Sequence, residues 1–200
     1  MKIKFTLLTS MLGTLPSDQE VFKTYVASKA PEESGEESLA TPEEVEKKGT
    51  TIFHRNDQGE LILRDYLIKG ALKARADAIR ARKGKGKDEK GNWGSIRGKI
   101  DEDVHVYPEM ISLGITEPDG MYERPLRAMT AQGPRVSLAN SETVNAGRSW
   151  ECEILLRPGR ITEKMLIEIL DELQYVGFGQ WRNAGHGRTS YTITEGAPDV

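Results

Sequence analysis

Apolar and polar side chains alternate at the start of the chain, where Ile3, Phe5 and Leu7 are separated by polar residues. Alternation with a period of two places the three apolar side chains on one face. Residues 2–8 are therefore predicted to form a half-buried strand and not the apolar region of a signal peptide, and a cytoplasmic protein is expected.

Similar strand-like patterns recur along the chain. Further strands are predicted at 51–54, 61–63, 104–115, 135–138, 149–156 and 188–194. The first two of these flank a polar turn that ends in Gly59, which is typical of a β-hairpin.

Two segments instead have apolar residues spaced by three and four positions, as in amphipathic helices. The first runs from residue 64 to 82. The second runs from 162 to 176, with Thr162 as its predicted N-cap and Gly177 as its predicted C′ residue.

The order of these elements predicts the fold class. With the insertions removed, the order is strand, helix, strand, strand, helix, strand, which is the α+β, ferredoxin-like (RRM-like) βαββαβ plan. We expect a single domain over residues 1–200, with an acidic, partly helical insertion at about 16–50 and a thumb-like hairpin at about 116–146. Ser17 and Glu20 have the spacing of a capping box at the start of the first insertion.

Charge is unevenly distributed along the chain, although the formal net charge is only −3. Residues 18–48 contain nine acidic and four basic side chains, whereas residues 64–99 contain twelve basic and four acidic side chains. A basic segment of this density is typical of a surface that binds phosphates. Within it, Lys69 and Lys73 lie one helical turn apart and are predicted to contact RNA together.

The segment from Gly177 to Arg188 contains four glycines and two arginines in twelve positions. Glycine allows another backbone to approach closely, and arginine and tryptophan can bind phosphate and stack on bases. The predicted RNA-binding residues of this loop are Gly177, Gly179, Trp181, Arg182, Gly185, His186, Gly187 and Arg188. An aromatic side chain from 104–125 is a further candidate for stacking. The alternative is a connection that is rich in glycine only because it packs tightly.

Three segments together resemble the RAMP (repeat-associated mysterious protein) superfamily of CRISPR-associated RNA-binding proteins. They are the first strand with its exit to Gly13, the helix opening Leu67-Ile68-Lys69-Gly70-Ala71-Leu72-Lys73, and the run from Asn145 through the second helix to the glycine-rich loop. Within the superfamily, they are most similar to the backbone subunit that lines up along the guide RNA.

This resemblance implies a non-catalytic subunit that holds single-stranded, guide-like RNA in a repeated ribonucleoprotein assembly. The implied partners are RNA, further copies of the chain and other CRISPR effector subunits, with no membrane partner. Some backbone subunits cut target RNA with an aspartate. Asp101 and Asp103, in a predicted loop, are the residues that could take this role.

Two other function classes stay open. One is a metal-independent endoribonuclease of the same superfamily that processes CRISPR RNA, with His186 or His54 activating a ribose hydroxyl. The other is a RAMP-shaped mimic or inhibitor that acts by docking on a protein. No cofactor or metal site is indicated, since metal-binding and hydrolytic motifs are missing from the sequence. The single cysteine, Cys152, is predicted to be a buried thiol.

Overall fold

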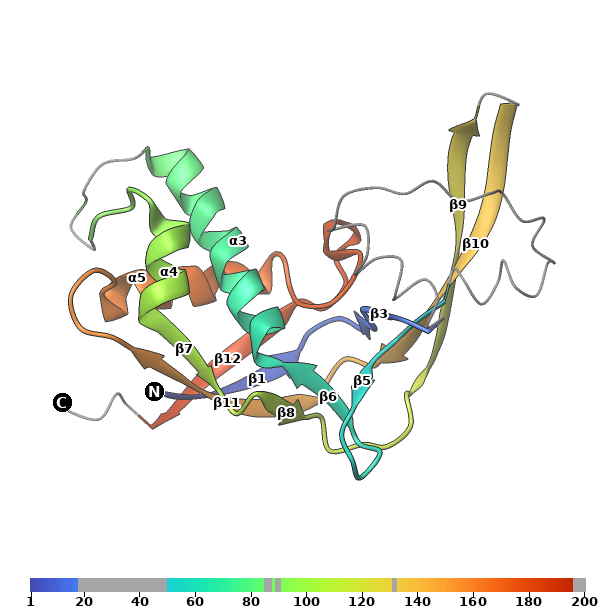
Figure 1. The fold of residues 1–200 in the computed structure, drawn as a ribbon, viewed down its shortest axis with the longest axis horizontal. Helices are drawn as coiled ribbons and strands as arrows, with labels where there is room; N and C mark the ends of the chain where they lie inside the picture. The colour runs from blue at the N-terminus through green and yellow to red at the C-terminus, as the bar shows by residue number, and fades with distance from the viewer. Residues whose placement is uncertain (18–49, 85–87, 89–90, 131–132, 196–200) are drawn as a thin grey trace, which may run out of the picture.

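A four-stranded antiparallel sheet forms the centre of the molecule (Figure 1). The computed structural model describes residues 1–17, 50–84, 88, 91–130 and 133–195. In spatial order, the strands of this sheet are β12 (Thr189–Glu195), β1 (Lys2–Leu7), β11 (Ser149–Leu156) and β7 (Val104–Tyr107). The strand predicted from the alternating N-terminal pattern is thus a central strand, paired on both sides.

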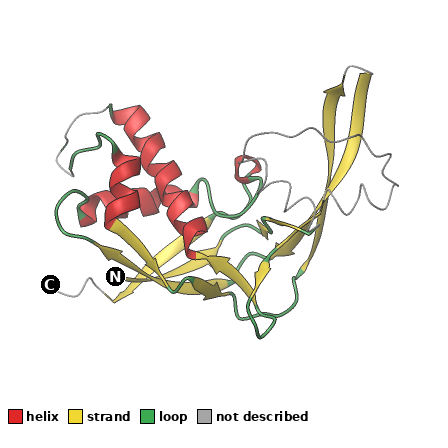
Figure 2. Ribbon diagram, viewed as in Figure 1, coloured by secondary structure: helices red, strands yellow, loops and turns green. Residues whose placement is uncertain are grey.

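Three helices cover one face of this sheet (Figures 1 and 2). They are α3 (Asp65–Lys83), α4 (Ile96–Asp103) and α5 (Glu163–Asp171). The helix predicted over 64–82 is confirmed as α3. The sequence did not predict α4, because its eight residues bury only two apolar side chains, Ile96 and Ile100. None of the described helices is long and apolar enough to cross a bilayer.

The second predicted helix is shorter than expected. Thr162 is confirmed as its N-cap, since the Thr162 hydroxyl accepts a hydrogen bond from the backbone N–H of Met165 at 3.1 Å. However, α5 ends at Asp171 and a 3-10 turn, η1 (Glu172–Gln174), follows it. The prediction of Gly177 as the C′ residue was therefore wrong, because the tighter turn ends the helix before the chain reaches that glycine.

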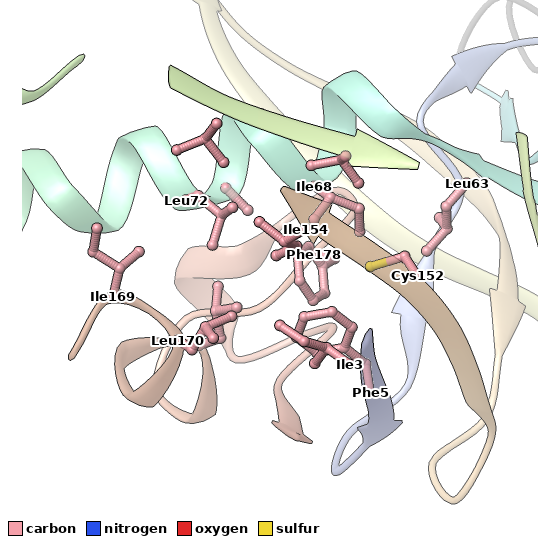
Figure 3. Packing of buried hydrophobic residues seen from close by; sticks show 14 of the residues in the cluster. Ile3, Phe5, Leu63, Ile68, Leu72, Cys152, Ile154, Ile169, Leu170 and Phe178 are labelled. Carbon is pink, nitrogen blue, oxygen red and sulfur yellow. The ribbon is translucent and has the colours of Figure 1, made fainter. Parts of the chain in front are cut away.

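The core lies between the sheet and the helices (Figure 3). Phe5 of β1 stacks on Trp150 of β11, with ring centroids 5.7 Å apart, and meets Phe178 edge-on at 5.4 Å. Phe178 belongs to the glycine-rich loop, so this loop is anchored in the core by a fully buried ring. Cys152 is also buried, as predicted, and burial raises the pKa of its thiol to about 12.

A long hairpin projects from the body of the molecule (Figure 1). It consists of β9 (Gly120–Thr130) and β10 (Gly133–Val144), which pair in antiparallel register along their whole length. Its base pairs with the short strands β2 (Met11–Leu12) and β4 (Thr50–Ile52), and β4 pairs in turn with β3 (Leu15–Pro16).

The buried carboxylate of Glu142 fixes this base. It accepts hydrogen bonds from the backbone N–H of Phe53 and the guanidinium of Arg55, each at 2.8 Å. The base of the hairpin is thereby tied to the strands that precede α3.

The predicted hairpin before the first helix is also confirmed. It is formed by β5 (His54–Arg55) and β6 (Leu61–Arg64), and β8 (Met110–Ser112) adds to β6 as a third strand. The molecule is therefore a mixed α+β protein with several sheets, and its order of elements is compatible with a ferredoxin-like plan. Most of the predicted acidic insertion, 18–49, lies outside the described residues. Of the predicted capping box, Ser17 is described and Glu20 is not.

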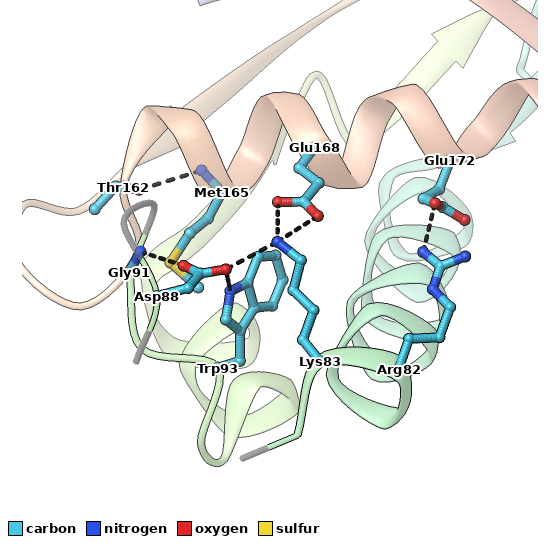
Figure 4. A network of polar contacts seen from close by, with 9 residues as sticks. All are labelled: Arg82, Lys83, Asp88, Gly91, Trp93, Thr162, Met165, Glu168 and Glu172. Atoms are coloured by element: carbon cyan, nitrogen blue, oxygen red, sulfur yellow. Dashed lines mark hydrogen bonds and ion pairs between the residues drawn. The ribbon is translucent and has the colours of Figure 1, made fainter. Parts of the chain in front are cut away.

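A polar network fastens the end of α3 to α5 (Figure 4). The ammonium group of Lys83 lies 2.8 Å from a carboxylate oxygen of Asp88 and 2.7 Å from one of Glu168. Asp88 also accepts a hydrogen bond from the indole N–H of Trp93 at 2.9 Å. Lys83, a residue of the basic segment 64–99, is therefore used in packing. Lys85, Lys87 and Lys90 of the same segment lie outside the described residues.

An ion pair between a buried carboxylate and an exposed arginine joins the end of α4 to the turn before α5. Asp103 is only 2% exposed, and its two carboxylate oxygens lie 2.7 and 2.8 Å from Nε and Nη2 of Arg160. The hydrogen bonds from Arg160 hold the pKa of Asp103 below the ordinary value of 3.8. Because the folded state lowers this pKa, the pair stabilises the fold above pH 3.8, and the stabilisation is lost as the pH falls through the folded-state value.

We expect Arg160→Gln to lower the free energy of unfolding at pH 7, because it leaves the Asp103 carboxylate buried without its partner. The difference between wild type and variant should shrink as the pH falls from 3.8 through the lower pKa of Asp103 in the folded state, because the carboxylate becomes protonated over this range. Urea unfolding followed by circular dichroism between pH 2.5 and pH 7 would measure this difference. A difference that stays constant with pH would contradict the assignment.

Candidate functional site

The glycine-rich loop, residues 177–188, folds back on itself and against the connection between β1 and β2. The N–H of Phe178 donates to the carbonyl of Gly187 at 2.9 Å, and the N–H of Gly187 donates to the carbonyl of Ser10 at 2.8 Å. The backbone N–H of Arg188 donates to the hydroxyl of Thr9 at 3.0 Å. These N–H groups are therefore used inside the fold and are not free to bind a phosphate.

Close packing explains the glycines at three positions of this loop. A Cβ atom on Gly177 would lie 1.5 Å from the carbonyl oxygen of Gly187, one on Gly187 would lie 1.9 Å from that of Phe178, and one on Gly179 would lie 2.6 Å from that of Leu12. Gly187 and Gly179 also have positive φ, at +70° and +79°. Gly185 has a φ of +87°, but a Cβ atom there would meet nothing within 4 Å. The tight packing considered as an alternative thus accounts for Gly177, Gly179 and Gly187.

Four side chains meet where the base of the hairpin touches the loop, and we call them the aromatic–arginine cluster. They are Tyr122 and Arg124 of β9 and Trp181 and His186 of the loop. The His186 ring stacks on Trp181 with centroids 5.5 Å apart and meets Tyr122 at 4.9 Å. The Arg124 guanidinium carbon lies 4.4 Å from the centre of the Trp181 ring. Tyr122 belongs to the segment 104–125, and it packs on His186 and Trp181; stacking of this segment on bases stays a prediction.

Trp181 is held in an unusual conformation within this cluster. Its φ is +51°, which is rare for a residue other than glycine, and 41% of its surface is exposed. One ring nitrogen of His186 is already engaged within the protein, since its Nδ1 lies 3.3 Å from both the hydroxyl and the carbonyl oxygen of Ser10. Its ring is also enclosed by two aromatic neighbours, as expected for a residue that supports the loop.

A groove of about 470 Å³ lies between the loop and the start of α3. It is lined by Thr14, Leu15, Pro16, His54, Tyr66, Leu67 and Gln180. Within it, Nε2 of His54 lies 3.2 Å from the hydroxyl of Tyr66. Burial and the nearby charge of Arg64 lower the pKa of His54, so its imidazole is neutral at neutral pH.

Two arginines contact η1, and the charges of two more act close by; we call all four the arginine cluster: Arg75, Arg82, Arg182 and Arg188. Arg82 pairs with Glu172 at 2.5 Å, and Nε of Arg188 donates to the carbonyl of Gln174 at 2.6 Å. Burial and the neighbouring charge of Arg182 lower the pKa of Arg75. The sequence predicted Arg182 and Arg188 but not Arg75, although a cation among the regularly spaced apolar residues of a helix was a usable signal.

Lys69 and Lys73 lie together, as their spacing predicted, but on a different flank of α3. The ammonium group of Lys69 donates to the carbonyl of Asp101 in α4 at 2.8 Å, and that of Lys73 lies 2.6 Å from the Asp101 carboxylate. Two residues further on, Arg75 is rotated by about 200° around the helix and faces the loop instead. The structure therefore separates the two lysines from the arginine cluster.

The two aspartates considered for cutting target RNA are not in a loop. Asp101 and Asp103 both belong to α4, which the apolar spacing did not predict. Asp103 is buried against Arg160, and Asp101 binds the two lysines of α3. In these positions both carboxylates stabilise helix packing.

The face of the central sheet opposite the helices is poorly suited to phosphates. Residues alternate in burial along each strand, and this face exposes Lys2 and Lys4 of β1 beside Glu151 and Glu153 of β11. Lys2 is also paired with Glu195 at 2.8 Å. The carboxylates cancel the positive charge, so the helix side is the better candidate.

No protein-family model and no curated protein matches the chain. Solved structures are similar to it, among them the following three. A Cas6 product complex and Thermus thermophilus Cas6 each share 14% identity with a TM-score of 0.35, and 96% of this chain matches 50% and 53% of theirs. A chain of a Type IV-B CRISPR complex shares 12% identity with a TM-score of 0.46, and the match covers 100% of this chain and 93% of that one.

This chain thus spans about half the length of the two Cas6 chains. With TM-scores below 0.5, these similarities do not assign a function to the chain.

We expect Gly187→Ala to lower the free energy of unfolding by at least about 3 kcal/mol, since it adds both backbone strain and a clash with the carbonyl of Phe178. Gly185→Ala is the matched control, because it has a similar φ without a clash, and it should cost about 1 kcal/mol. Thermal and urea unfolding would compare the two variants. Equal losses would show that close packing is not what requires Gly187.

Proposed function

We propose that the chain is a non-catalytic RNA-binding subunit that holds single-stranded, guide-like RNA by its phosphate backbone in a CRISPR-type assembly. The RNA lies along the flank of α3 that faces the glycine-rich loop. The observation that carries this proposal is the arginine cluster, in which guanidinium groups from α3 and from the loop converge on η1.

The charge of this cluster is only partly neutralised within the described part of the chain. Glu172 pairs with Arg82 and its charge also acts on Arg75, but no described carboxylate lies within ion-pair distance of Arg75, Arg182 or Arg188. Like charges held close together repel one another, and a phosphodiester anion removes that repulsion. Arginine also offers several N–H groups in a planar fork that suits phosphate oxygens.

The groove extends this surface toward the start of α3. Leu67 lines the groove, and Arg75 follows it by eight residues, or about 12 Å along the helix, on the loop-facing flank. Gln180 lines the same groove one residue before Trp181 and two before Arg182. A single RNA strand can therefore place sugars and bases in the groove and the phosphates that follow them at the arginines. This division of contacts is typical of complexes between proteins and nucleic acids.

The proposal includes a ferredoxin-like βαββαβ core, made of β1, α3, β7, β11, α5 and β12. This plan is supported by the antiparallel order β12-β1-β11-β7 and by the helices on one face. The β9–β10 hairpin takes the role of the thumb-like insertion. Copies of the chain or other CRISPR subunits bound along one RNA would add their modest contacts, which gives high avidity. Lys69 and Lys73 lie outside this path.

Replacing both Arg75 and Arg182 by Gln should weaken binding of a 20-nucleotide oligouridine about 10-fold or more at 100 mM salt. Each lost phosphate contact should also reduce the slope of log affinity against log salt by about 0.7. Fluorescence anisotropy at several salt concentrations measures both quantities.

Arg97→Gln serves as the control, because Arg97 is an exposed arginine of α4 that pairs with Asp77 of α3. It should leave the slope nearly unchanged. The double variant Lys69→Gln with Lys73→Gln tests the other flank of α3. Wild-type protein that does not bind the oligouridine at low salt would contradict the proposal and favour the protein-docking class.

A second candidate function is metal-independent cleavage of RNA, which the His54–Tyr66 pair favours. His54 lies in the groove, and its lowered pKa keeps the imidazole neutral and able to accept a proton. The hydroxyl of Tyr66, 3.2 Å from Nε2, can orient the ring or donate a proton. His186 is less suited to this role, because its ring is enclosed by Tyr122 and Trp181.

If the groove is a nuclease site, labelled RNA should be cleaved in the presence of EDTA, and His54→Ala should reduce the rate at least about 100-fold. His105→Ala is the control, since His105 lies on the exposed face of β7. The substrate should be a mixed-sequence single strand with a stem-loop, followed on a denaturing gel. Intact RNA after overnight incubation with wild-type protein would leave the non-catalytic proposal in place.

A further inference from the structure

We propose a second phosphate-binding site, formed by Arg124 on the surface of Trp181, where the base of the hairpin meets the glycine-rich loop. Its ligand is one phosphodiester group of the bound strand, so this inference rests on the proposed function. The site would let the hairpin and the loop hold the same RNA.

The position of Arg124 follows from its strand. Residues alternate between the two faces of β9, so Tyr122 and Arg124 share a face and Glu123 lies on the other. Both side chains of the shared face contact the loop, through His186 and Trp181. The carboxylate of Glu123 is therefore directed away from the guanidinium of Arg124.

The guanidinium of Arg124 is held in place but lacks acceptors. Its carbon lies 4.4 Å from the centre of the Trp181 ring, a distance that gives a cation–π interaction. Its Nε and Nη1 atoms are shielded from water, yet neither has a hydrogen-bond partner among the described residues. Charged N–H groups without acceptors are costly in free energy, so the free protein is incomplete at this point.

An anionic oxygen supplies what is missing. A change in the χ angles of Arg124 that keeps its guanidinium stacked on the indole would turn the unpaired Nε and Nη1 edge toward an incoming phosphate. Arginine stacked on an aromatic ring is well suited to a bidentate contact with phosphate. The contact with Arg124 also helps to hold Trp181 at its φ of +51° with 41% of its surface exposed.

The neighbouring charges favour a nucleic-acid phosphate over a protein carboxylate. Arg182 follows Trp181 directly in sequence and belongs to the arginine cluster, so the Arg124 site continues the proposed path of the strand. A polymer with a phosphate on every unit can fill several such sites in succession, whereas one protein carboxylate fills a single site.

The first experiment measures oligouridine affinity against salt for Arg124→Gln, Arg124→Lys and Trp181→Leu. Arg124→Gln should bind about fivefold more weakly, with the salt slope reduced by about 0.7. Arg124→Lys should recover the slope but not the full affinity, because lysine keeps the charge and loses the planar stacking. The double variant Trp181→Leu with Arg124→Gln should bind oligouridine about as tightly as whichever single variant binds it more weakly. The reason is that the two side chains act as a unit, so their effects on affinity do not add.

The second experiment does not depend on RNA. Inorganic phosphate should raise the melting temperature of the wild type more than that of Arg124→Gln, whereas Arg97→Gln should respond like the wild type. Arg124→Gln should itself fold, because it removes only the cation–π contact with Trp181 and no ion pair with a described carboxylate.

The outcomes separate the two proposals. An unchanged salt slope and phosphate response in Arg124→Gln, while Arg75→Gln with Arg182→Gln weakens RNA binding, would overturn the Arg124 site and keep the proposed function. A phosphate response that depends on Arg124, in a wild type that does not bind RNA, would support the site and overturn the proposed function.

Discussion

The close contact between two backbone segments of the glycine-rich loop is the constraint on which the candidate site depends. Gly177 and Gly187 lie against each other with no room for a Cβ atom, and the N–H of Gly187 bonds to the carbonyl of Ser10. This contact closes the loop, buries Phe178 against Phe5, and turns the tip of the loop outward. The packing of the loop therefore requires these two glycines, whatever the loop binds. They fix a frame that presents Trp181 and Arg182, which is a form of preorganisation that reduces the entropy lost on binding.

The basic side chains of α3 lie on two different flanks of the helix and contact different parts of the molecule. Lys69 and Lys73 are engaged by Asp101 of α4, whereas Arg75 faces the loop and shares its surroundings with Arg182. Side chains two positions apart on a helix point in nearly opposite directions, so neighbouring cations in the sequence serve different surfaces. The same basic segment thus contributes both to helix packing and to the candidate phosphate surface. Its high charge density does not by itself indicate which residues bind RNA.

The hairpin and the loop form one surface because their side chains interlock. Tyr122 and Arg124 come from β9, Trp181 and His186 come from the loop, and Glu142 ties the base of the hairpin to Phe53 and Arg55 before α3. A ligand that contacts Arg124 therefore affects the hairpin, the loop and the groove beside His54 together. In both functions considered, non-catalytic binding and cleavage, RNA would occupy this same region, and they differ in whether His54 reaches a ribose hydroxyl.

The sequence alone determined the main elements and the loop. Alternating residues fixed the faces of β1 and β11, helical spacing defined α3, and Thr162 marked the start of α5, because these signals depend on local geometry. It also located Trp181, Arg182 and His186 in one candidate site. Only the tertiary structure showed that α4 exists, that Asp103 is buried with Arg160, and that Arg75 and Arg124 join the site. These features depend on contacts between residues far apart in the chain. Local patterns cannot encode which flank of a helix faces which loop, since packing of the whole core decides that orientation.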